Sequence, residues 1–234
     1  MKLAILSDIH GNHIALKAVL KSIDEFKIKK LIILGDFVGY YYWPEKVLKL
    51  IQKYDVIAIA GNHEYILKKS LTSGSYLNKI NKKYGSGIKL AIKKLTSEQI
   101  NYLINLPNKK IFKTNEGEIL LCHGSPWNDD EYIYPDKFDQ YIERYKKINY
   151  KWILQGHTHY PMIKTLKNKI VINPGSVGQT RNREYGAHWS LLDTKKNEVM
   201  HYCEPYNTNY IMKAANKYDP TIKYLSRILG KQYT

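Results

Sequence analysis

Five apolar runs in this sequence each end in a side chain that can bind a metal ion, usually next to a glycine. In chain order, KLAILS is followed by Asp8 and His10, KLIILG by Asp36, VIAIAG by Asn62, EILLC by His123, and KWILQG by His157 and His159. The carboxyl ends of parallel strands share one edge of an α/β sheet, where ligands bind. The pattern therefore predicts that these side chains converge.

Each of these residues also has an ordinary explanation when it is taken alone. An Asp or Asn after a strand is common in turns, and a single histidine at a strand end is more often a capping or surface residue. Five strand ends that share the feature are hard to ascribe to chance, so we interpret them as one site.

The first third of the chain alternates apolar runs with amphipathic segments. Apolar side chains recur at helical spacing within residues 13–26, and residues 44–54 form a second expected helix with Pro44 in its first turn. The continuous apolar runs around them predict a largely parallel sheet that is covered on both faces.

The rest of the chain has a different pattern of apolar and charged residues, but no segment in it reads as a linker between domains. Residues 65–106 are Lys-rich and expected to be mostly helical, with a capping box that starts at Thr96. Residues 132–147 also read as a helix, and short strands between residues 162 and 204 predict an antiparallel half. We expect one domain over residues 1–234, with residues 207–234 as a helical tail packed on it.

The net charge of +16, from 37 basic and 21 acidic residues, suggests nucleic acid, an anionic surface or a phosphate-bearing substrate. Only four of the basic residues are Arg, and the Lys residues are spread along the whole chain. Genome base composition produces the same bias. Nucleic acid is therefore kept as an alternative partner that is not favoured.

The sequence predicts a cytoplasmic protein with no membrane association. No apolar run approaches the roughly 20 residues that cross a bilayer, and the N-terminal run is too short for a signal peptide. Cys122 and Cys203 form no CxxC pair, so we expect reduced thiols, with Cys122 as a small buried hydrophobic side chain.

The seven candidate ligands comprise two carboxylates, one amide oxygen and four imidazoles. This set is too large for a single tetrahedral zinc ion. Mixed oxygen and nitrogen coordination suits two divalent transition-metal ions, with manganese favoured and iron, nickel or zinc as alternatives. Two such ions about 3.5–4 Å apart can share a hydroxide that attacks phosphorus in line.

Six sequence blocks, in order, resemble those of the calcineurin-like metallophosphoesterases. They are SDIHGN, GDFVGY, GNHE, CHGSP, GHTH and INPGSVGQ, and the resemblance spans Met1 to about Asp193. The first block is similar to that of a branch of small bacterial and archaeal phosphodiesterases. The resemblance implies a four-layer α-β-β-α sandwich, in which two packed mixed β-sheets are flanked by helices.

The resemblance also implies roles for individual residues. Asp8, His10 and His159 would hold one metal ion, Asn62, His123 and His157 would hold the other, and Asp36 would bridge the two. His63 matches the family's catalytic histidine, which faces the substrate and assists the leaving group. Glu64 would either orient a neighbouring imidazole or be an exposed carboxylate in the first turn of a helix.

Substrate-binding residues are predicted less directly. Asn12 would reach a phosphate oxygen or cap the following helix, and Asn173 and Ser176 would line the site or form a structural turn. Arg181 and Arg183 follow that loop, and Arg181 is expected to grip phosphate. Five aromatic residues would form a rim that stacks on a nucleobase or be ordinary surface residues: Tyr40, Tyr41, Tyr42, Trp43 and Trp127.

These observations lead to one hypothesis and two alternatives. The chain is expected to be a dinuclear metal-dependent phosphohydrolase, a phosphodiesterase or phosphatase, in which a metal-bridging hydroxide attacks a small phosphodiester or nucleotide-like substrate. The alternatives are a metal-dependent nuclease and a non-catalytic protein-binding scaffold with the same fold. The exposed aromatics or the C-terminal helices could also form a homodimer interface.

Overall fold

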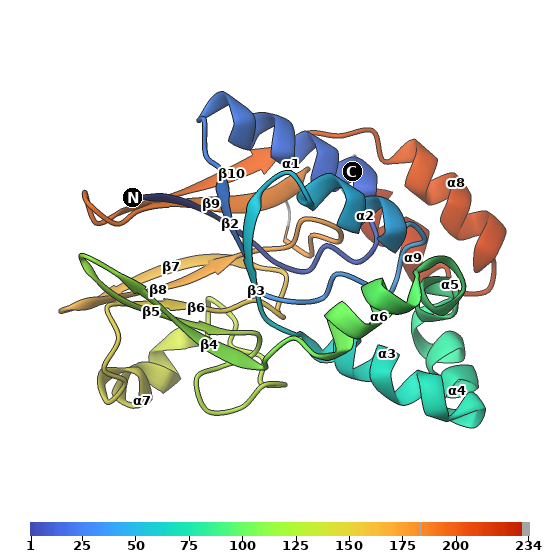
Figure 1. Cartoon of the computed structure of the whole chain (residues 1–234), viewed down its shortest axis with the longest axis horizontal. Helices are drawn as coiled ribbons and strands as arrows, with labels where there is room; N and C mark the ends of the chain where they lie inside the picture. Colours follow the sequence, from blue (N-terminus) through green and yellow to red (C-terminus); the bar gives the residue numbers. More distant parts are fainter. Residues whose placement is uncertain (183, 231–234) are drawn as a thin grey trace.

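Two five-stranded mixed β-sheets face each other at the centre of the protein (Figure 1). The computed structural model describes residues 1–182 and 184–230. Arg183 and residues 231–234 of the expected tail lie outside the described residues. The first sheet has the order β10 (Glu198–Glu204), β9 (Ala187–Asp193), β1 (Lys2–Leu6), β2 (Lys30–Ile33) and β3 (Asp55–Ala58). The second has the order β4 (Lys109–Thr114), β5 (Gly117–Cys122), β6 (Trp152–Leu154), β8 (Lys169–Pro174) and β7 (Pro161–Leu166).

Helices cover the outer faces of both sheets and confirm the expected four layers. The first sheet packs against α1 (His13–Glu25) and α2 (Pro44–Ile51), and the second packs against η1 (Phe138–Tyr141) and α7 (Ile142–Lys146). A helical group lies beyond the end of β3: α3 (Asn62–Thr72), α4 (Gly74–Tyr84), α5 (Gly87–Lys94) and α6 (Ser97–Ile104). The tail carries α8 (Asn209–Tyr218) and α9 (Tyr224–Gly230).

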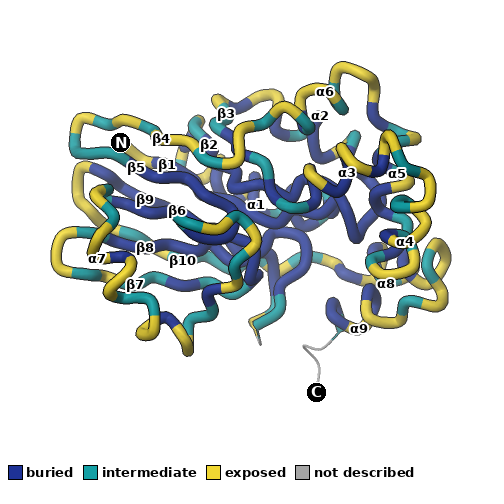
Figure 2. Tube along the Cα trace, turned by 90° about the horizontal axis from the view of Figure 1, so that it is seen from below, coloured by how far each residue is buried: buried dark blue, intermediate teal, exposed yellow. Residues whose placement is uncertain are grey.

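The inner strands β1, β2, β6, β8 and β9 are largely buried on both faces, as their continuous apolar runs predict (Figure 2). In β1, Leu3 and Ile5 point between the sheets, whereas Ala4 and Leu6 point to the helices. The pairs β1–β2 and β2–β3 are parallel, and β9–β10 and β7–β8 are antiparallel. The predicted change from a parallel to an antiparallel half is thus confirmed, although β6–β8 is parallel.

Two elements differ from the sequence-based expectation. Residues 132–137 form a loop rather than the start of a helix, because Pro135 disfavours helical backbone in the residue before it and Ile133 is buried against the second sheet. Strand β4 was not predicted, since it is a Lys-rich, largely exposed edge strand without a clear apolar period.

The ligand-bearing strand ends come from two sheets rather than one. Strands β1, β2 and β3 belong to the first sheet, and β5 and β6 belong to the second. The backbone links the two sheets at these ends: after β8 of the second sheet, the N–H of Val177 donates to the carbonyl of Ser7 and the N–H of Gly178 donates to the carbonyl of Asp8, both just after β1 of the first sheet. The shared edge is therefore the seam between two facing sheets.

The C-terminal helices pack on the segment Tyr40–Trp43. The Tyr41 hydroxyl donates to the carbonyl of Leu225 at 3.1 Å, and the ring of Trp43 stacks on Tyr210 with centroids 5.0 Å apart. All four side chains of the segment are buried, so the expected aromatic rim is wrong for them, as is the surface alternative. Trp127 packs under Arg144 instead, with the guanidinium 3.9 Å from its ring.

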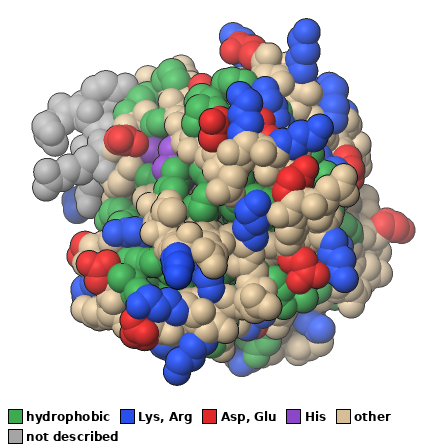
Figure 3. All heavy atoms as spheres, turned by 90° about the vertical axis from the view of Figure 1, so that its left-hand side faces the viewer, with side chains coloured by type: hydrophobic (Ala, Val, Ile, Leu, Met, Phe, Trp, Pro, Cys, Tyr) green, Lys and Arg blue, Asp and Glu red, His purple; other side chains and the backbone are tan. Residues whose placement is uncertain are grey.

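The charged surface shows no single basic stripe on the face drawn in Figure 3. Lys and Arg side chains lie scattered there among acidic and hydrophobic ones. Within the described residues, no helix has the length and hydropathy needed to span a membrane.

Candidate metal centre

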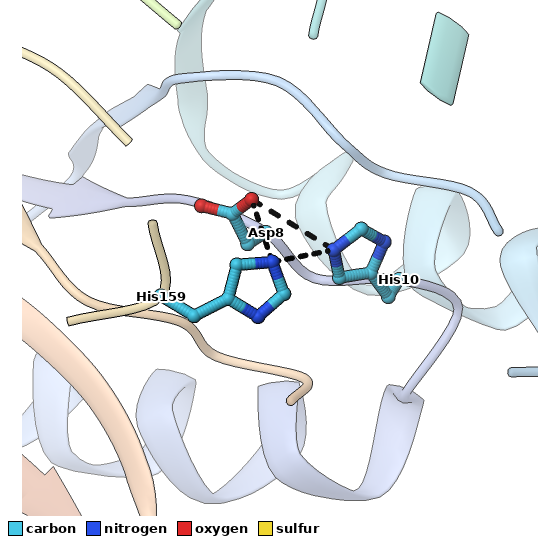
Figure 4. A group of neighbouring side chains, drawn as sticks. All are labelled: Asp8, His10 and His159. Atoms are coloured by element: carbon cyan, nitrogen blue, oxygen red, sulfur yellow. Dashed lines mark hydrogen bonds and ion pairs between the residues drawn. The ribbon is translucent and has the colours of Figure 1, made fainter. Parts of the chain in front are cut away.

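Asp8, His10 and His159 meet in a fully buried group at the ends of β1 and β6 (Figure 4). The Nε2 atoms of the two histidines lie 3.2 Å apart, and Asp8 Oδ1 lies 3.2 Å from His159 Nε2 and 3.7 Å from His10 Nε2. The three ligand atoms thus face one point, although they come from positions about 150 residues apart in sequence.

Backbone contacts fix which ring nitrogens can bind a metal. His10 Nδ1 lies 3.1 Å from the carbonyl of Val38, and His159 Nδ1 contacts the carbonyl of Gln179. A carbonyl only accepts, so each Nδ1 carries the proton and each neutral ring leaves an Nε2 lone pair. Such outer contacts orient metal-binding histidines.

His123, Asn62 and His157 form a second group beside the first. His123 Nε2 lies 3.1 Å from Asn62 Oδ1 and 3.1 Å from His157 Nδ1. The Nδ1 atom of His123 lies 2.6 Å from the carbonyl of Leu34, so its Nε2 is also the unprotonated nitrogen of the neutral ring.

Asp36 lies between the two groups. Its Oδ2 is 3.6 Å from His10 Nε2 and 3.5 Å from His123 Nε2, and its Oδ1 accepts the backbone N–H of His63 at 2.8 Å. Burial opposes ionisation of this carboxyl, but the charges of His123 and His63 hold its pKa well below the usual value. One carboxylate oxygen therefore faces both groups.

The donor set fits bound cations. Nitrogen lone pairs and a carboxylate oxygen converge at about 3 Å, where they repel unless a positive charge lies among them. Two ligand atoms each about 2.1 Å from one ion stand roughly 3–3.5 Å apart, as the Nε2 atoms of His10 and His159 do. Asp8 Oδ1 is buried, and among the residues that the structure describes no hydrogen-bond partner satisfies it. Although burial lowers the pKa of His123, Asp36 raises it to about 10, which again marks a demand for positive charge.

Five of the seven candidate ligands have left-handed backbone. They are Asp8 (φ 54°), His10 (50°), Asp36 (56°), His157 (68°) and His159 (62°). Each such conformation costs on the order of 1–3 kcal/mol in a non-glycine residue. Backbone bonds between the loops hold them, for example from His10 N–H to the Asp36 carbonyl and from Gly178 N–H to the Asp8 carbonyl.

His63 lies beside the candidate ligands at the start of α3. Its ring is buried, 4.7 Å from the ring of His10 and 4.9 Å from that of Tyr40. Burial lowers the pKa of His63 although Asp36 opposes this, so the imidazole is neutral near pH 7. Distance alone also allows His63 to bind a metal with His10 and Asp36.

Glu64 neither contacts an imidazole nor faces solvent, so both sequence-based alternatives are wrong for it. It is 1% exposed, and its carboxylate accepts the backbone N–H groups of Asp36, Phe37 and Gly61 at 2.8–2.9 Å. The side chain thereby ties the loop that carries Asp36 to the N-terminus of α3.

The polar atoms of three predicted substrate-binding residues are bonded within the protein. Asn12 caps α1 through Ala15 N–H and donates to the Gly178 carbonyl. Asn173 donates to the Gly156 carbonyl, and Ser176 donates to the Asp8 carbonyl. The structure therefore favours the cap and turn alternatives. By contrast, the half-buried Arg181 donates to Tyr40 and Gln179, and within the described chain no carboxylate pairs with it.

The structure adds residues that the sequence interpretation did not include. Asp130 Oδ1 lies 3.3 Å from His157 Nε2, and the ring of Tyr132 lies 3.9 Å from the ring of His157. Tyr224 of α9 donates to the Gln179 side chain that also accepts from Arg181. The adjacent acids Asp129 and Asp130 soon after the CHGSP block were the one signal available; nothing near Tyr224 marked it.

Comparisons with known proteins agree with this geometry. A family model described as the calcineurin-like phosphoesterase superfamily domain matches residues 1–197. The chain belongs to this superfamily. It is thus a hydrolase that acts on phosphoester bonds, and the family implies divalent metal ions.

Individual relatives cover between 82% and 99% of the chain. An uncharacterised protein of Methanocaldococcus jannaschii is 32% identical, covering 82% of this chain and 83% of its own. A hypothetical protein of Pyrococcus horikoshii has a crystal structure with a TM-score of 0.84 at 28% identity, covering 97% of both chains. A metallophosphoesterase from Sphaerobacter thermophilus shares the fold with a TM-score of 0.80 at 23% identity, covering 99% of this chain and 98% of its own.

Proposed function

We propose that this metallophosphoesterase uses two divalent metal ions, manganese being favoured, to hydrolyse a small phosphodiester or nucleotide-like phosphoester. The observation that carries the proposal is the position of Asp36 Oδ2 between the Nε2 atoms of His10 and His123. In this arrangement Asp8, His10 and His159 would hold one ion, Asn62, His123 and His157 would hold the other, and Asp36 would contact both. Once bound, the pair would lower the pKa of a shared water, supply the nucleophile and neutralise charge on phosphorus.

His63 is proposed to protonate the leaving-group oxygen. Its neutral imidazole lies beside the rings of His10 and Tyr40, 4.7 Å and 4.9 Å from their centroids, so it borders the site without needing to join it. The negative charge of a bound phosphoester would raise the pKa of His63 and let the ring carry the proton that it then donates.

Arg181 is proposed to bind a phosphoryl oxygen. Its guanidinium is positioned by neutral oxygens of Tyr40 and Gln179, and Gln179 is held in turn by Tyr224. Neutral partners fix the direction of the side chain and leave its charge available, which suits the recognition of an anion.

Hydrolysis assays with metal-stripped protein test the proposal. We expect bis-p-nitrophenyl phosphate or p-nitrophenyl phosphate to be hydrolysed once manganese, nickel or zinc is restored, and magnesium to be less effective. Asp36→Asn should lose this activity together with one or both bound ions, counted by elemental analysis. If no metal restores hydrolysis to wild-type protein that holds two ions, the proposal is wrong, and a non-catalytic protein-binding scaffold is favoured instead.

The net charge of +16 keeps a nuclease as a second candidate. Its binding to DNA or RNA would weaken steeply with salt, because each phosphate contact releases counterions. On the face drawn in Figure 3 the basic side chains are scattered, so that face offers no continuous stripe for a long strand.

A further inference from the structure

A cleft of about 580 Å³ opens directly beside the second ligand group. Its floor includes Gly61, Asn62 and His123, its first wall is formed by α3 and α4, and its second wall by the loop after β5. A volume of this size is typical of small-molecule sites. Whatever is attached to a phosphorus atom at the metal centre can therefore extend into this cleft.

Four tyrosines line the cleft from both walls. Tyr65, Tyr76 and Tyr84 come from the helices, and Tyr132 comes from the loop opposite. The side chains of Tyr65 and Tyr132 are 64% and 43% exposed, so their rings are not needed to fill the core. Rings exposed along a cleft present faces on which a planar group can stack.

The charges in the cleft argue against a second phosphate. Apart from His123, its charged lining residues are Lys83 on the helical wall and Asp129 and Asp130 on the loop wall. Asp129 is paired with Lys109, whose Nζ lies 3.0 Å from Asp129 Oδ1, so Lys83 and Asp130 remain as one positive and one negative charge. A neutral planar group with polar edges is therefore accommodated more readily than a polyphosphate or a nucleic-acid backbone.

We propose that this cleft binds a nucleobase, so that the substrate is a nucleoside ester with a single phosphate at the metal centre. The inference rests on the proposed function for the phosphate, but the base site depends on different residues. Tyr65 and Tyr132 stack against the base from the two walls, and Lys83 and Asp130 contact its polar edge.

Calorimetric binding to the manganese-loaded protein tests the base site separately from catalysis. Adenosine 5′-monophosphate and ribose 5-phosphate carry the same phosphate and differ in the base. We expect the nucleotide to bind at least about fivefold more tightly, since stacking on one aromatic ring contributes that much or more. Adenosine 5′-diphosphate should bind no more tightly than the monophosphate.

Variants of the cleft tyrosines test whether the preference for the nucleotide over ribose 5-phosphate comes from this cleft. Tyr65→Ala and Tyr132→Ala should each bring the ratio of the two dissociation constants toward one, and Tyr65→Ala is the cleaner test because Tyr132 also contacts His157. Tyr102→Ala is the matched control, since Tyr102 is a 44% exposed helical tyrosine that does not line this cleft. It should keep the wild-type ratio.

The outcomes separate the two proposals. Equal binding of nucleotide and ribose phosphate, with metal-dependent hydrolysis of bis-p-nitrophenyl phosphate intact, would overturn the base site alone. A preference for the nucleotide that survives both tyrosine variants would also overturn it. If neither compound binds and no metal supports hydrolysis, both the proposed base site and the proposed function are wrong.

Discussion

At the scale of single residues, the candidate site is built from conformations that the residues do not prefer. Five ligands have positive φ angles, and the imidazoles of His10 and His159 present Nε2 lone pairs toward each other at 3.2 Å. Each feature costs free energy in the protein alone and is offset when cations bind. Residues that break local preference together are expected at functional sites.

His63→Ala separates the two roles that distance allows for this histidine. If His63 donates a proton, the variant should keep two metal ions per chain and lose about 10²- to 10⁴-fold in kcat, the usual contribution of a general acid. Both quantities come from elemental analysis and steady-state kinetics on the same sample. His201→Ala, which changes a half-buried histidine of β10, is the control.

The result distinguishes a proton donor from a ligand. Loss of an ion in His63→Ala would make His63 a ligand beside His10 and Asp36, and full activity would remove it from the mechanism.

At the scale of elements, the loops after the strands set the site, and they depend on close backbone approach. Gly39, in the loop between β2 and α2, has φ +87°, and a β-carbon built there would lie 1.9 Å from His63 Nδ1. A β-carbon on Gly61, at the N-terminus of α3, would lie 2.2 Å from Asp36 Oδ1. The glycines in these sequence blocks leave space for the functional side chains.

Gly39→Ala should therefore mimic loss of His63 without touching the ligands. The added methyl group must displace the imidazole, so we expect kcat to fall about ten- to a hundredfold, within the usual contribution of a positioned acid, with two ions retained. Gly74→Ala controls for an added methyl group that meets no atom within 4 Å, and urea denaturation of Gly39→Ala measures the separate cost of its left-handed backbone. Unchanged kcat in Gly39→Ala would show that His63 moves freely or does not act.

At the scale of the whole molecule, the C-terminal tail braces the site although the family model ends at residue 197. The Asp219 carboxylate accepts from the Tyr42 hydroxyl and from the backbone and side chain of Ser86, all at 2.9–3.0 Å. It thus joins the tail to the buried aromatic segment and to the turn between α4 and α5. Tyr224 extends the same tail to Gln179 beside Arg181.

Asp219→Ala should lower the free energy of unfolding by about 2–3 kcal/mol, because it leaves the buried hydroxyl of Tyr42 and the Ser86 N–H without their acceptor. Urea denaturation measures the change. Asp136→Ala, at an exposed aspartate, is the control and should stay within about 0.5 kcal/mol of wild type. An equal, small effect of both variants would mean that the tail is held by its apolar contacts alone.

The sequence by itself determined the elements that repeat a strong pattern. Continuous apolar runs fixed the buried strands, helical periodicity fixed α1 and α2, and the Thr96 capping box starts α6 as expected. The family blocks gave the fold and the ligand candidates, because a metal-binding residue at a strand end is a local feature. Weak local signals failed: the loop at residues 132–137 and the exposed strand β4 are set by packing rather than by period.

Only the tertiary structure decided which residues from distant parts of the sequence contact one another. The sequence left Tyr40–Trp43 as either an aromatic rim or ordinary surface residues, but α8 and α9 bury this segment, and no local pattern encodes which surface a tail will cover. The sequence predicted that Glu64 contacts an imidazole or faces solvent. In the structure its carboxylate accepts three backbone N–H groups from two loops. The cleft beside the second ligand group is lined by tyrosines of α3 and α4 and by a loop whose Tyr132 lies more than 40 residues after Tyr84, the last residue of α4. Such contacts depend on how the sheets and helices assemble, and that follows from burial of the whole apolar surface rather than from any one stretch of the chain.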